Sequence, residues 1–230
     1  MEYLDVLNED GEFLGYKRSR RDCHNLGLWH RVTYGFLFNE YGDVLLQKRS
    51  TNKKSWPNLW DVSVSGHISA GEYGKNALKR EIEEEIGLVV NINQLEYFAS
   101  SKSHQVVGKK INNHFNDCYI INVDVDINDL TPLEEETSEL KWFTKNQIIR
   151  RIHNNYNGLT PKEGYWNFLL QIYKIKRFKK RPPQNNSKYN KKNYNKKTNY
   201  NDSHYNYKNN KFSSSYIKNK NKPYNKQTHK

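Results

Sequence analysis

The stretch GHISAGEYGKNALKREIEEEIGL, residues 66–88, decides the fold of this chain. Its glycine-rich beginning predicts a loop, and the pattern that follows predicts a helix over residues 73–86. On that helix Glu81, Glu84 and Glu85 fall at positions i, i+3 and i+4 and share one face. Because three neighbouring carboxylates repel one another, the spacing favours a hard divalent cation with oxygen ligands, Mg²⁺ or Mn²⁺. The alternative is a solvated acidic face, the commoner meaning of EIEEE taken alone.

The same stretch carries the residues that would hold the loop and the helix in place. The apolar side of the helix consists of Ala77, Leu78, Ile82 and Ile86. Glu72 and Arg80 are placed to form a salt bridge that fixes the loop against the acidic face. Gly66, Gly71 and Gly87 supply backbone freedom where the loop becomes the helix and where the helix ends.

The positive charge of the chain is confined to its C-terminal part. The 230 residues carry a net charge of +13, which by itself suggests a nucleic-acid binder. Residues 179–230 contain 15 Lys or Arg residues and one acid, Asp202, whereas residues 1–178 contain 23 basic and 24 acidic residues. The basic character therefore belongs to the tail and does not describe the rest of the chain.

Residues 1–178 are long enough for one domain with its own core. Cys23 and Cys118 are too few and too far apart in sequence for a disulfide framework or a zinc site. The sequence opens on no apolar signal segment, and no run of 18 apolar residues is present to span a membrane. We therefore expect a reduced, cytosolic protein.

Segments rich in β-formers predict a sheet. The predicted strands span residues 3–7, 13–17, 32–38, 44–49, 91–100, 114–125 and 140–143. The first two form a small hairpin around Asp10-Gly11 that covers an edge of the sheet. The next two form its central hairpin, and the fifth and sixth are joined across Gly108–Lys110.

Two helices are predicted after the sheet. Residues 144–153 form the first. Thr160-Pro161-Lys162-Glu163 matches a capping box with proline at the first helical position, so the second helix is predicted to begin there. Its apolar residues close the domain near Phe178; they are Trp166, Phe168, Leu169, Ile172 and Tyr173.

Two basic residues follow the central hairpin. Arg49 and Lys53 lie at the start of the loop that precedes the glycine-rich stretch, and paired cations near a metal site favour phosphate recognition. Surface solubility is the alternative. Trp56 and Trp60 on this loop are expected to pack, with substrate contact by one of them as the second interpretation.

The complete spacing of residues 66–88 resembles the Nudix box. Its fixed positions are all filled, by Gly66, Glu72, Arg80, Glu81, Ile82, Glu84, Glu85, Gly87 and Leu88. The resemblance implies a Nudix hydrolase with an α/β/α sandwich on a mixed sheet and a core over about residues 28–155. It also implies Mg²⁺- or Mn²⁺-dependent hydrolysis of a small-molecule substrate in which a diphosphate is linked to another moiety.

Residues 3–150 resemble in particular the Nudix branch that contains type 1 isopentenyl-diphosphate isomerase. In that branch an arginine and a lysine at the positions of Arg49 and Lys53 hold the diphosphate. The resemblance further implies a second metal site, whose ligand positions here are His24, His30, His67, Glu134 and Glu136. A lone histidine before a strand is more often structural than a ligand, so both roles stay open for His24 and His30.

The catalytic cysteine of the isomerases has no counterpart, because its position, two residues before His67, holds Ser65. The isomerases also carry a basic residue where this chain has Glu81. Since a serine hydroxyl substitutes poorly for the thiol, we expect hydrolysis and not isomerisation. The catalytic carboxylates would be those of Glu84, Glu85 and Glu136. Glu85 and Glu136 are both candidates for the general base, and that choice stays open.

Residues 179–230 predict a disordered tail, because their Asn-, Lys- and Tyr-rich sequence has hardly any aliphatic residues to bury. Such a tail is compatible with weak contact to single-stranded nucleic acid or another anionic surface, with codon drift as the alternative.

Three hypotheses follow: a diphosphate hydrolase, an isopentenyl-diphosphate isomerase, and a non-catalytic binding module tethered to RNA. The group attached to the diphosphate stays open among nucleotide, sugar nucleotide, thiamine-type and isoprenoid compounds.

Overall fold

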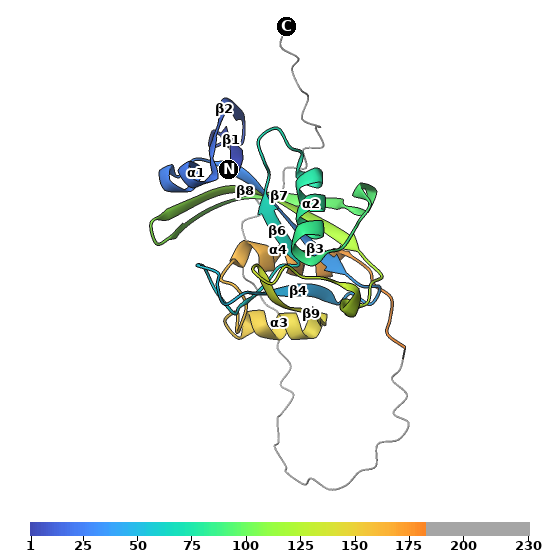
Figure 1. The fold of residues 1–230 in the computed structure, drawn as a ribbon. Helices are drawn as coiled ribbons and strands as arrows, with labels where there is room; N and C mark the ends of the chain where they lie inside the picture. The colour runs from blue at the N-terminus through green and yellow to red at the C-terminus, as the bar shows by residue number, and fades with distance from the viewer. Residues whose placement is uncertain (183–230) are drawn as a thin grey trace.

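The strand β3 (His30–Phe38) lies at the centre of the larger sheet in the computed structural model, which describes residues 1–182 (Figure 1). The other strands of this sheet are β4 (Val44–Arg49), β5 (Trp60–Asp61), β6 (Val64–His67), β7 (Glu96–Val107), β8 (Lys110–Asn122) and β9 (Thr137–Phe143). They run in the order β5-β4-β3-β8-β7, with β6 paired to β3 and β9 paired to β4. Because β3 is parallel to β8 and antiparallel to β6, the sheet is mixed, as predicted.

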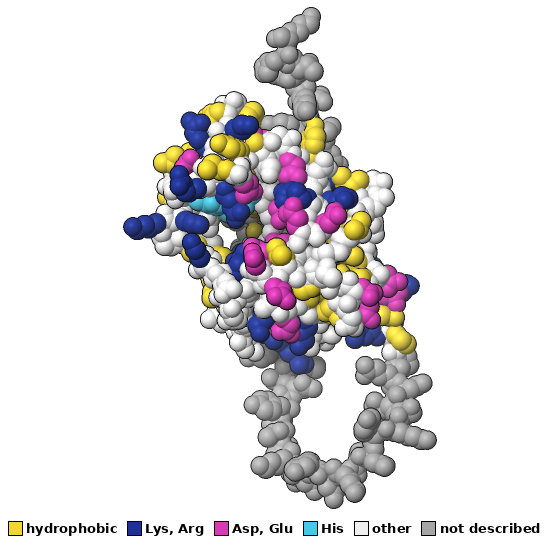
Figure 2. Space-filling model, in the orientation of Figure 1, with side chains coloured by type: hydrophobic (Ala, Val, Ile, Leu, Met, Phe, Trp, Pro, Cys, Tyr) yellow, Lys and Arg dark blue, Asp and Glu magenta, His cyan; other side chains and the backbone are white. Residues whose placement is uncertain are grey.

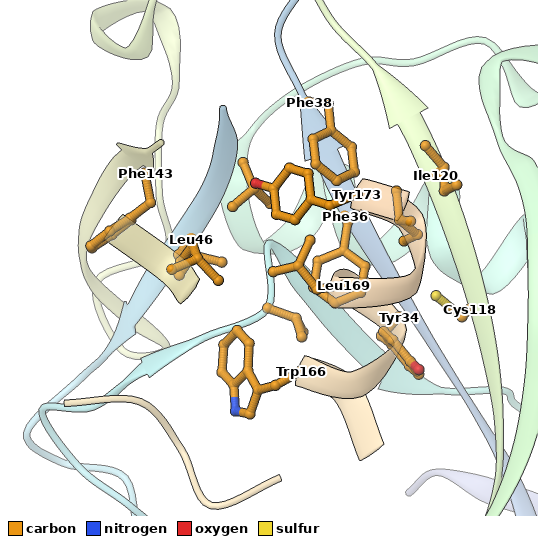
Figure 3. Close-up of a cluster of buried hydrophobic side chains, with 14 of the residues drawn as sticks. Tyr34, Phe36, Phe38, Leu46, Cys118, Ile120, Phe143, Trp166, Leu169 and Tyr173 are labelled. Atoms are coloured by element: carbon orange, nitrogen blue, oxygen red, sulfur yellow. The ribbon is translucent and has the colours of Figure 1, made fainter. Parts of the chain in front are cut away.

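Helices cover both faces of this sheet. The helical segments are α1 (Arg20–Leu26), α2 (Gly74–Ile86), α3 (Lys145–His153) and α4 (Glu163–Ile175), with short turns at η1 (Ile92–Gln94) and η2 (Ile127–Asp129). Since successive strand residues point to opposite faces, Tyr34 and Phe36 of β3 pack with Leu169 of α4 (Figure 3). Leu37 packs instead with Leu78 of α2. The predicted α/β/α sandwich is confirmed.

Helix α2 approaches β3 closely at Gly35. A Cβ atom at Gly35 would lie 2.7 Å from Cδ1 of Ile121 and 3.2 Å from Cδ2 of Leu78. A larger residue would therefore push the helix or β8 away from the strand. The buried residues of α2 are the predicted ones, Ala77, Leu78, Ile82 and Ile86.

The N-terminal hairpin forms a separate two-stranded sheet from β1 (Tyr3–Leu7) and β2 (Phe13–Ser19). It contacts the loop that leads into α2 at two points. The Ala70 amide donates to the carbonyl of Tyr3 at 2.8 Å. The Gly71 amide donates to the carboxylate of Asp5 at 2.9 Å. The hairpin therefore supports the loop that carries the first half of the box.

The strands β7 and β8 both extend further toward the turn that joins them than predicted, and both stop short of the predicted strands at the other end of the hairpin. The predicted strands covered residues 91–100 and 114–125, whereas β7 begins at Glu96 and β8 ends at Asn122. Residues before β7 form η1 instead, because the Asn91 side chain caps that turn. The polar middle of the hairpin pairs as strand, and its turn lies at the predicted glycine, Gly108.

The start of α4 was predicted wrongly. The helix begins at Glu163, after Lys162, and no side chain caps it. The Thr160 hydroxyl, which a capping box would use for the helix, donates instead to Asp61 at 3.1 Å. The Thr160 amide donates to the Trp60 carbonyl at 2.8 Å, which holds this segment extended beside β5.

The chain returns after α4 to the turn between β3 and β4. The ring of Phe178 lies 5.2 Å from that of Phe38 between centroids. The Lys179 ammonium lies 2.8 Å from a carboxylate oxygen of Glu40, and Arg181 pairs with Asp43. The first residues of the predicted tail thus contact the domain. The remaining prediction, disorder over residues 183–230, lies outside the described residues.

Within residues 1–182, no helix has the length and the apolar character needed to cross a membrane.

Candidate active site

One cavity of about 730 Å³ brings most of the predicted site residues together. Its lining includes His24, Arg49, Lys53, Ser65, Gly66, His67, Arg80, Glu81, Glu84, Glu85 and Glu136. Figure 2 shows acidic side chains gathered on this face beside Lys, Arg and His side chains. A larger, shallower hollow of about 1030 Å³ lies along the outer side of α2, but its lining lacks Arg49 and Lys53.

The predicted salt bridge between Glu72 and Arg80 is present, with 3.2 Å between Nη2 and Oε2. Arg80 also contacts two box carboxylates through Nη1, Glu81 at 2.7 Å and Glu84 at 3.1 Å. Its Nη2 donates to the carbonyl of His67 at 3.2 Å. Arg80 therefore joins the loop to the helix and offsets part of the repulsion between the glutamates.

Glu85 is the most enclosed of the three box carboxylates. Its Oε2 accepts from the side-chain amide of Gln47 at 3.0 Å and from the backbone amide of Ser65 at 3.3 Å. Burial, and then the nearby charge of Glu81, raise its pKa to about 8. A cation bound among these carboxylates would oppose both effects, so the site favours a positive ion.

Gly66 provides the space that Glu81 occupies. A Cβ atom at this position would lie 2.1 Å from Cδ and 2.2 Å from Oε1 of Glu81. Only glycine leaves room for this carboxylate beside β6. Oxygen donors from Glu81, Glu84 and Glu85 on one cavity wall fit the ligand preference of Mg²⁺ or Mn²⁺.

The two predicted phosphate-binding cations are held by carboxylates. Lys53 pairs with Glu136. Arg49 contacts Asp61 at 3.3 Å through Nη1 and donates from Nε to the Ser55 carbonyl at 2.9 Å. Both cations line the cavity, so the structure places them within reach of a ligand there.

Asp61 and its second partner, Lys162, were missed in the sequence. The Lys162 ammonium lies 2.7 Å from Oδ2 of Asp61, although 101 residues separate them along the chain. The sequence around Thr160 predicts a helix cap, and that prediction gives Lys162 no place in the cavity wall, which it lines in the structure. A lysine next to a proline carries no signal of such pairing.

Four histidines form a compact cluster in which His24 and His30 are buried and His114 is half-buried. His24 of α1, His30 of β3, His67 of β6 and His114 of β8 each offer a ring nitrogen, and these atoms all lie within 4.8 Å of one another. Nε2 of His24 lies 3.1 Å from Nε2 of His67. Nδ1 of His30 lies 2.8 Å from the Leu28 carbonyl. Within residues 1–182, Nδ1 of His24 and Nε2 of His30 and His114 have no hydrogen-bond partner.

Burial lowers the pKa of all four imidazoles, and that of His30 falls to about 4. The neutral imidazole is the form that binds transition metals. The resemblance implied Glu134 and Glu136 as further ligands, but the structure does not bring them into this cluster. Glu134 is exposed and Glu136 pairs with Lys53. His114 takes part instead, brought there by the parallel pairing of β8 with β3, in which it lies opposite His30.

Neither cysteine of the chain lies in the cavity lining. Cys23 and Cys118 are both fully buried, and burial raises the pKa of the Cys23 thiol to about 11. Ser65 does line the cavity, at the position where the resemblance to the isomerases implies a catalytic cysteine. The cavity therefore offers a hydroxyl and no thiol.

Residues 28–162 match the NUDIX domain family. The chain is 34% identical over 148 residues to an uncharacterized Nudix hydrolase of Listeria monocytogenes, lmo0368, a match that covers 64% of this chain and 83% of that protein. It is 28% identical over 130 residues to isopentenyl-diphosphate Delta-isomerase of Corynebacterium diphtheriae, covering 55% of this chain and 69% of the isomerase.

Among solved structures, DR0079 from Deinococcus radiodurans aligns with a TM-score of 0.57 at 26% identity, covering 75% of this chain and 99% of that one. Hydrolases of the Nudix family generally require a divalent cation such as Mg²⁺ or Mn²⁺. The family match spans more than half of this chain and includes the box, the central strands and both cations of the loop. The chain belongs to the Nudix hydrolase family, whose members act on phosphoric anhydrides.

Proposed function

We propose that this protein hydrolyses a diphosphate linked to another moiety, with Mg²⁺ or Mn²⁺ held by Glu81, Glu84 and Glu85. The observation that supports it most is one cavity lined both by the carboxylates of Glu81, Glu84 and Glu85 and by Arg49 and Lys53. The carboxylates fit the cation, and the basic side chains fit the phosphate oxygens. The group attached to the diphosphate stays open.

Different side chains of the cavity would bind the diphosphate and accept the proton. Arg49 and Lys53 bind and orient the diphosphate, and a carboxylate takes a proton from the attacking water. A bound divalent cation supplies charge neutralisation and lowers the pKa of water. Glu85 and Glu136 are the two candidates for the base. Because Glu136 pairs with Lys53, a diphosphate that competes for Lys53 would free the Glu136 carboxylate.

The test is a panel of diphosphate compounds assayed for phosphate release with Mg²⁺ and with EDTA. We expect Mg²⁺-dependent release that Glu85→Gln lowers by about 10²- to 10⁴-fold, the range of general-base and charge effects. Glu83→Gln is the matched control, since Glu83 lies on the same helix, pairs with Lys79 and does not line the cavity. Wild-type turnover by Glu85→Gln would remove Glu85 from the mechanism.

Isopentenyl-diphosphate isomerisation is the second candidate, favoured by the similarity to the isomerase. The cavity argues against it, because Ser65 replaces the thiol and both cysteines are buried elsewhere. Incubation with isopentenyl diphosphate should give no dimethylallyl isomer. Robust conversion would make isomerisation the better assignment.

We further propose that His24, His30, His67 and His114 hold a second metal ion. Four neutral nitrogen donors suit zinc and similar transition metals better than Mg²⁺, which prefers oxygen. The three ring nitrogens that lack a hydrogen-bond partner in the described part of the chain, and the burial of His24 and His30, support this assignment. The site would fix α1 and three strands at the side of the cavity.

A further inference from the structure

A buried carboxylate under the cavity wall holds two cations. Asp61 is fully buried on β5. Its Oδ2 accepts from Lys162 at 2.7 Å and from Arg49 at 3.3 Å. Its Oδ1 accepts from the hydroxyl of Thr160 at 3.1 Å and from the amide of Val62 at 3.0 Å. One carboxylate thus balances one of two adjacent positive charges, and the group as a whole keeps a net charge of +1.

Both cations face the cavity while they contact Asp61. The side chains of Arg49 and Lys162 are each 17% exposed, and both line the cavity. Although burial favours the protonated acid, the two cations hold the pKa of Asp61 below its ordinary value. The carboxylate is therefore ionised and keeps both cations in place. An ammonium has three donors, and Asp61 accepts from one of those of Lys162.

Two aromatic rings fix the position of the ammonium. Nζ of Lys162 lies 4.9 Å from the ring centroid of Tyr165 and 5.7 Å from that of Trp56. Trp56 adopts a φ of 51°, a left-handed conformation that is unfavourable for a bulky residue. The strained loop thus holds an aromatic wall against Lys162 at the cavity. A surplus positive charge that is held rigidly in a partly enclosed cavity is suited to an anionic ligand.

We propose that Lys162 is a substrate-binding residue that forms, with Arg49, a binding site for a phosphate group, held from below by Asp61. The inference rests on the proposed diphosphate hydrolysis and adds a third cation to Arg49 and Lys53. It assigns the start of α4 to the substrate site, where the sequence indicated only a helix cap. The competing explanation is structural, namely that Lys162 only neutralises Asp61.

The test measures binding of methylenediphosphonate, a diphosphate analogue that resists hydrolysis, to the full-length protein by calorimetry with Mg²⁺ present. Lys162→Met should weaken binding by about tenfold or more, the effect of losing a charged hydrogen bond. Lys162→Arg should retain most of the affinity. Lys48→Met is the matched control, because Lys48 lies on β4, pairs with Glu139 and does not line the cavity, and it should stay within about twofold of wild type.

A double variant separates binding from structural support. Asp61→Asn combined with Lys162→Met removes the carboxylate together with one of its two cations. If Lys162 only neutralised Asp61, its loss would no longer matter once that charge is absent. The affinity of the double variant for methylenediphosphonate should stay low. Wild-type affinity in Lys162→Met, or recovered affinity in the double variant, would overturn the inference and leave the proposed function standing. Failure of the wild-type protein to bind the analogue would overturn both.

Discussion

The box glutamates and the histidine cluster border the same cavity, yet they differ in origin, charge and exposure. Glu81, Glu84 and Glu85 come from one helix, and the Glu84 side chain is 56% exposed. The histidines come from one helix and three strands, and His30 is fully buried. Anionic oxygen donors suit Mg²⁺, whereas neutral imidazole nitrogens suit a transition metal. The difference supports the proposal of two metal sites with separate preferences.

The comparison is tested first by a variant that disturbs the box glutamates without changing a carboxylate. Gly66→Ala places a Cβ atom where the structure has 2.1 Å to Cδ of Glu81, so that side chain must move. A displacement of about 1 Å at a reacting centre can cost about 10²-fold in rate, and we expect a loss of that size in Mg²⁺-dependent turnover. Zinc binding at the histidines should be unaffected. Normal turnover would show that the position of Glu81 is unimportant.

The next prediction tests the proposed metal site at the histidine cluster. His114→Asn should lower zinc affinity by about tenfold or more, measured by competition with a chromophoric chelator and by metal analysis after dialysis. Glu84→Gln should keep its zinc. His104→Asn is the matched control, because His104 lies on β7 beside Asn113 and outside the cluster. Equal zinc content in all variants, or none in wild type, would remove the second metal site.

The same contrast explains how much of the molecule the sequence predicted. The extent of α2, its buried side and the salt bridge between Glu72 and Arg80 all follow from residue spacing over a few helical turns. The central hairpin likewise follows from local patterns. Such features are set by neighbours along the chain, and they are confirmed.

The features that were missed depend on contacts across the fold. His114 reaches the other histidines only because β8 pairs in parallel with β3, opposite His30. Asp61 meets Lys162 across 101 residues, and that contact also takes Thr160 away from the helix cap. No spacing rule within a short window contains this information. The functional box was therefore predictable, whereas its surroundings needed the pairing of distant strands.

A smaller expected effect is that the box and the histidine cluster change the free energy of unfolding in opposite directions with pH. The measurement is urea unfolding with EDTA at pH 5, 7 and 9. The folded pKa of Glu85 is raised to about 8, so stability falls as the pH rises from the ordinary carboxyl range to about 8. The folded pKa of His30 is lowered to about 4, so stability falls as the pH drops from the ordinary histidine range, near 6.5, to about 4. Each group contributes at most about 1.4 kcal/mol per pH unit within its window.

The variants should therefore show opposite signs of pH dependence. Relative to wild type, Glu85→Gln should gain stability between pH 5 and pH 9, because the glutamine carries no charge. His30→Asn should lose less stability than wild type between pH 7 and pH 5. Parallel pH profiles for both variants and wild type would contradict the pKa shifts.

The smallest expected effect on hydrolysis comes from deleting the C-terminal tail. The box carboxylates, Arg49 and Lys53 all precede the deleted segment in the sequence. Deleting residues 183–230 should leave hydrolysis of a small substrate within about twofold, since surface charges away from the site contribute little. The cut is placed there because Phe178 packs on Phe38, and Lys179 and Arg181 pair with acidic residues of the β3–β4 turn. The deleted segment holds 12 lysines and one acid. The full chain should therefore retain single-stranded RNA at low salt and lose it at moderate salt. The slope of log K against log salt concentration should steepen by about 0.7 for each phosphate contacted. Equal, salt-insensitive retention by both proteins would reject the tail as an electrostatic tether.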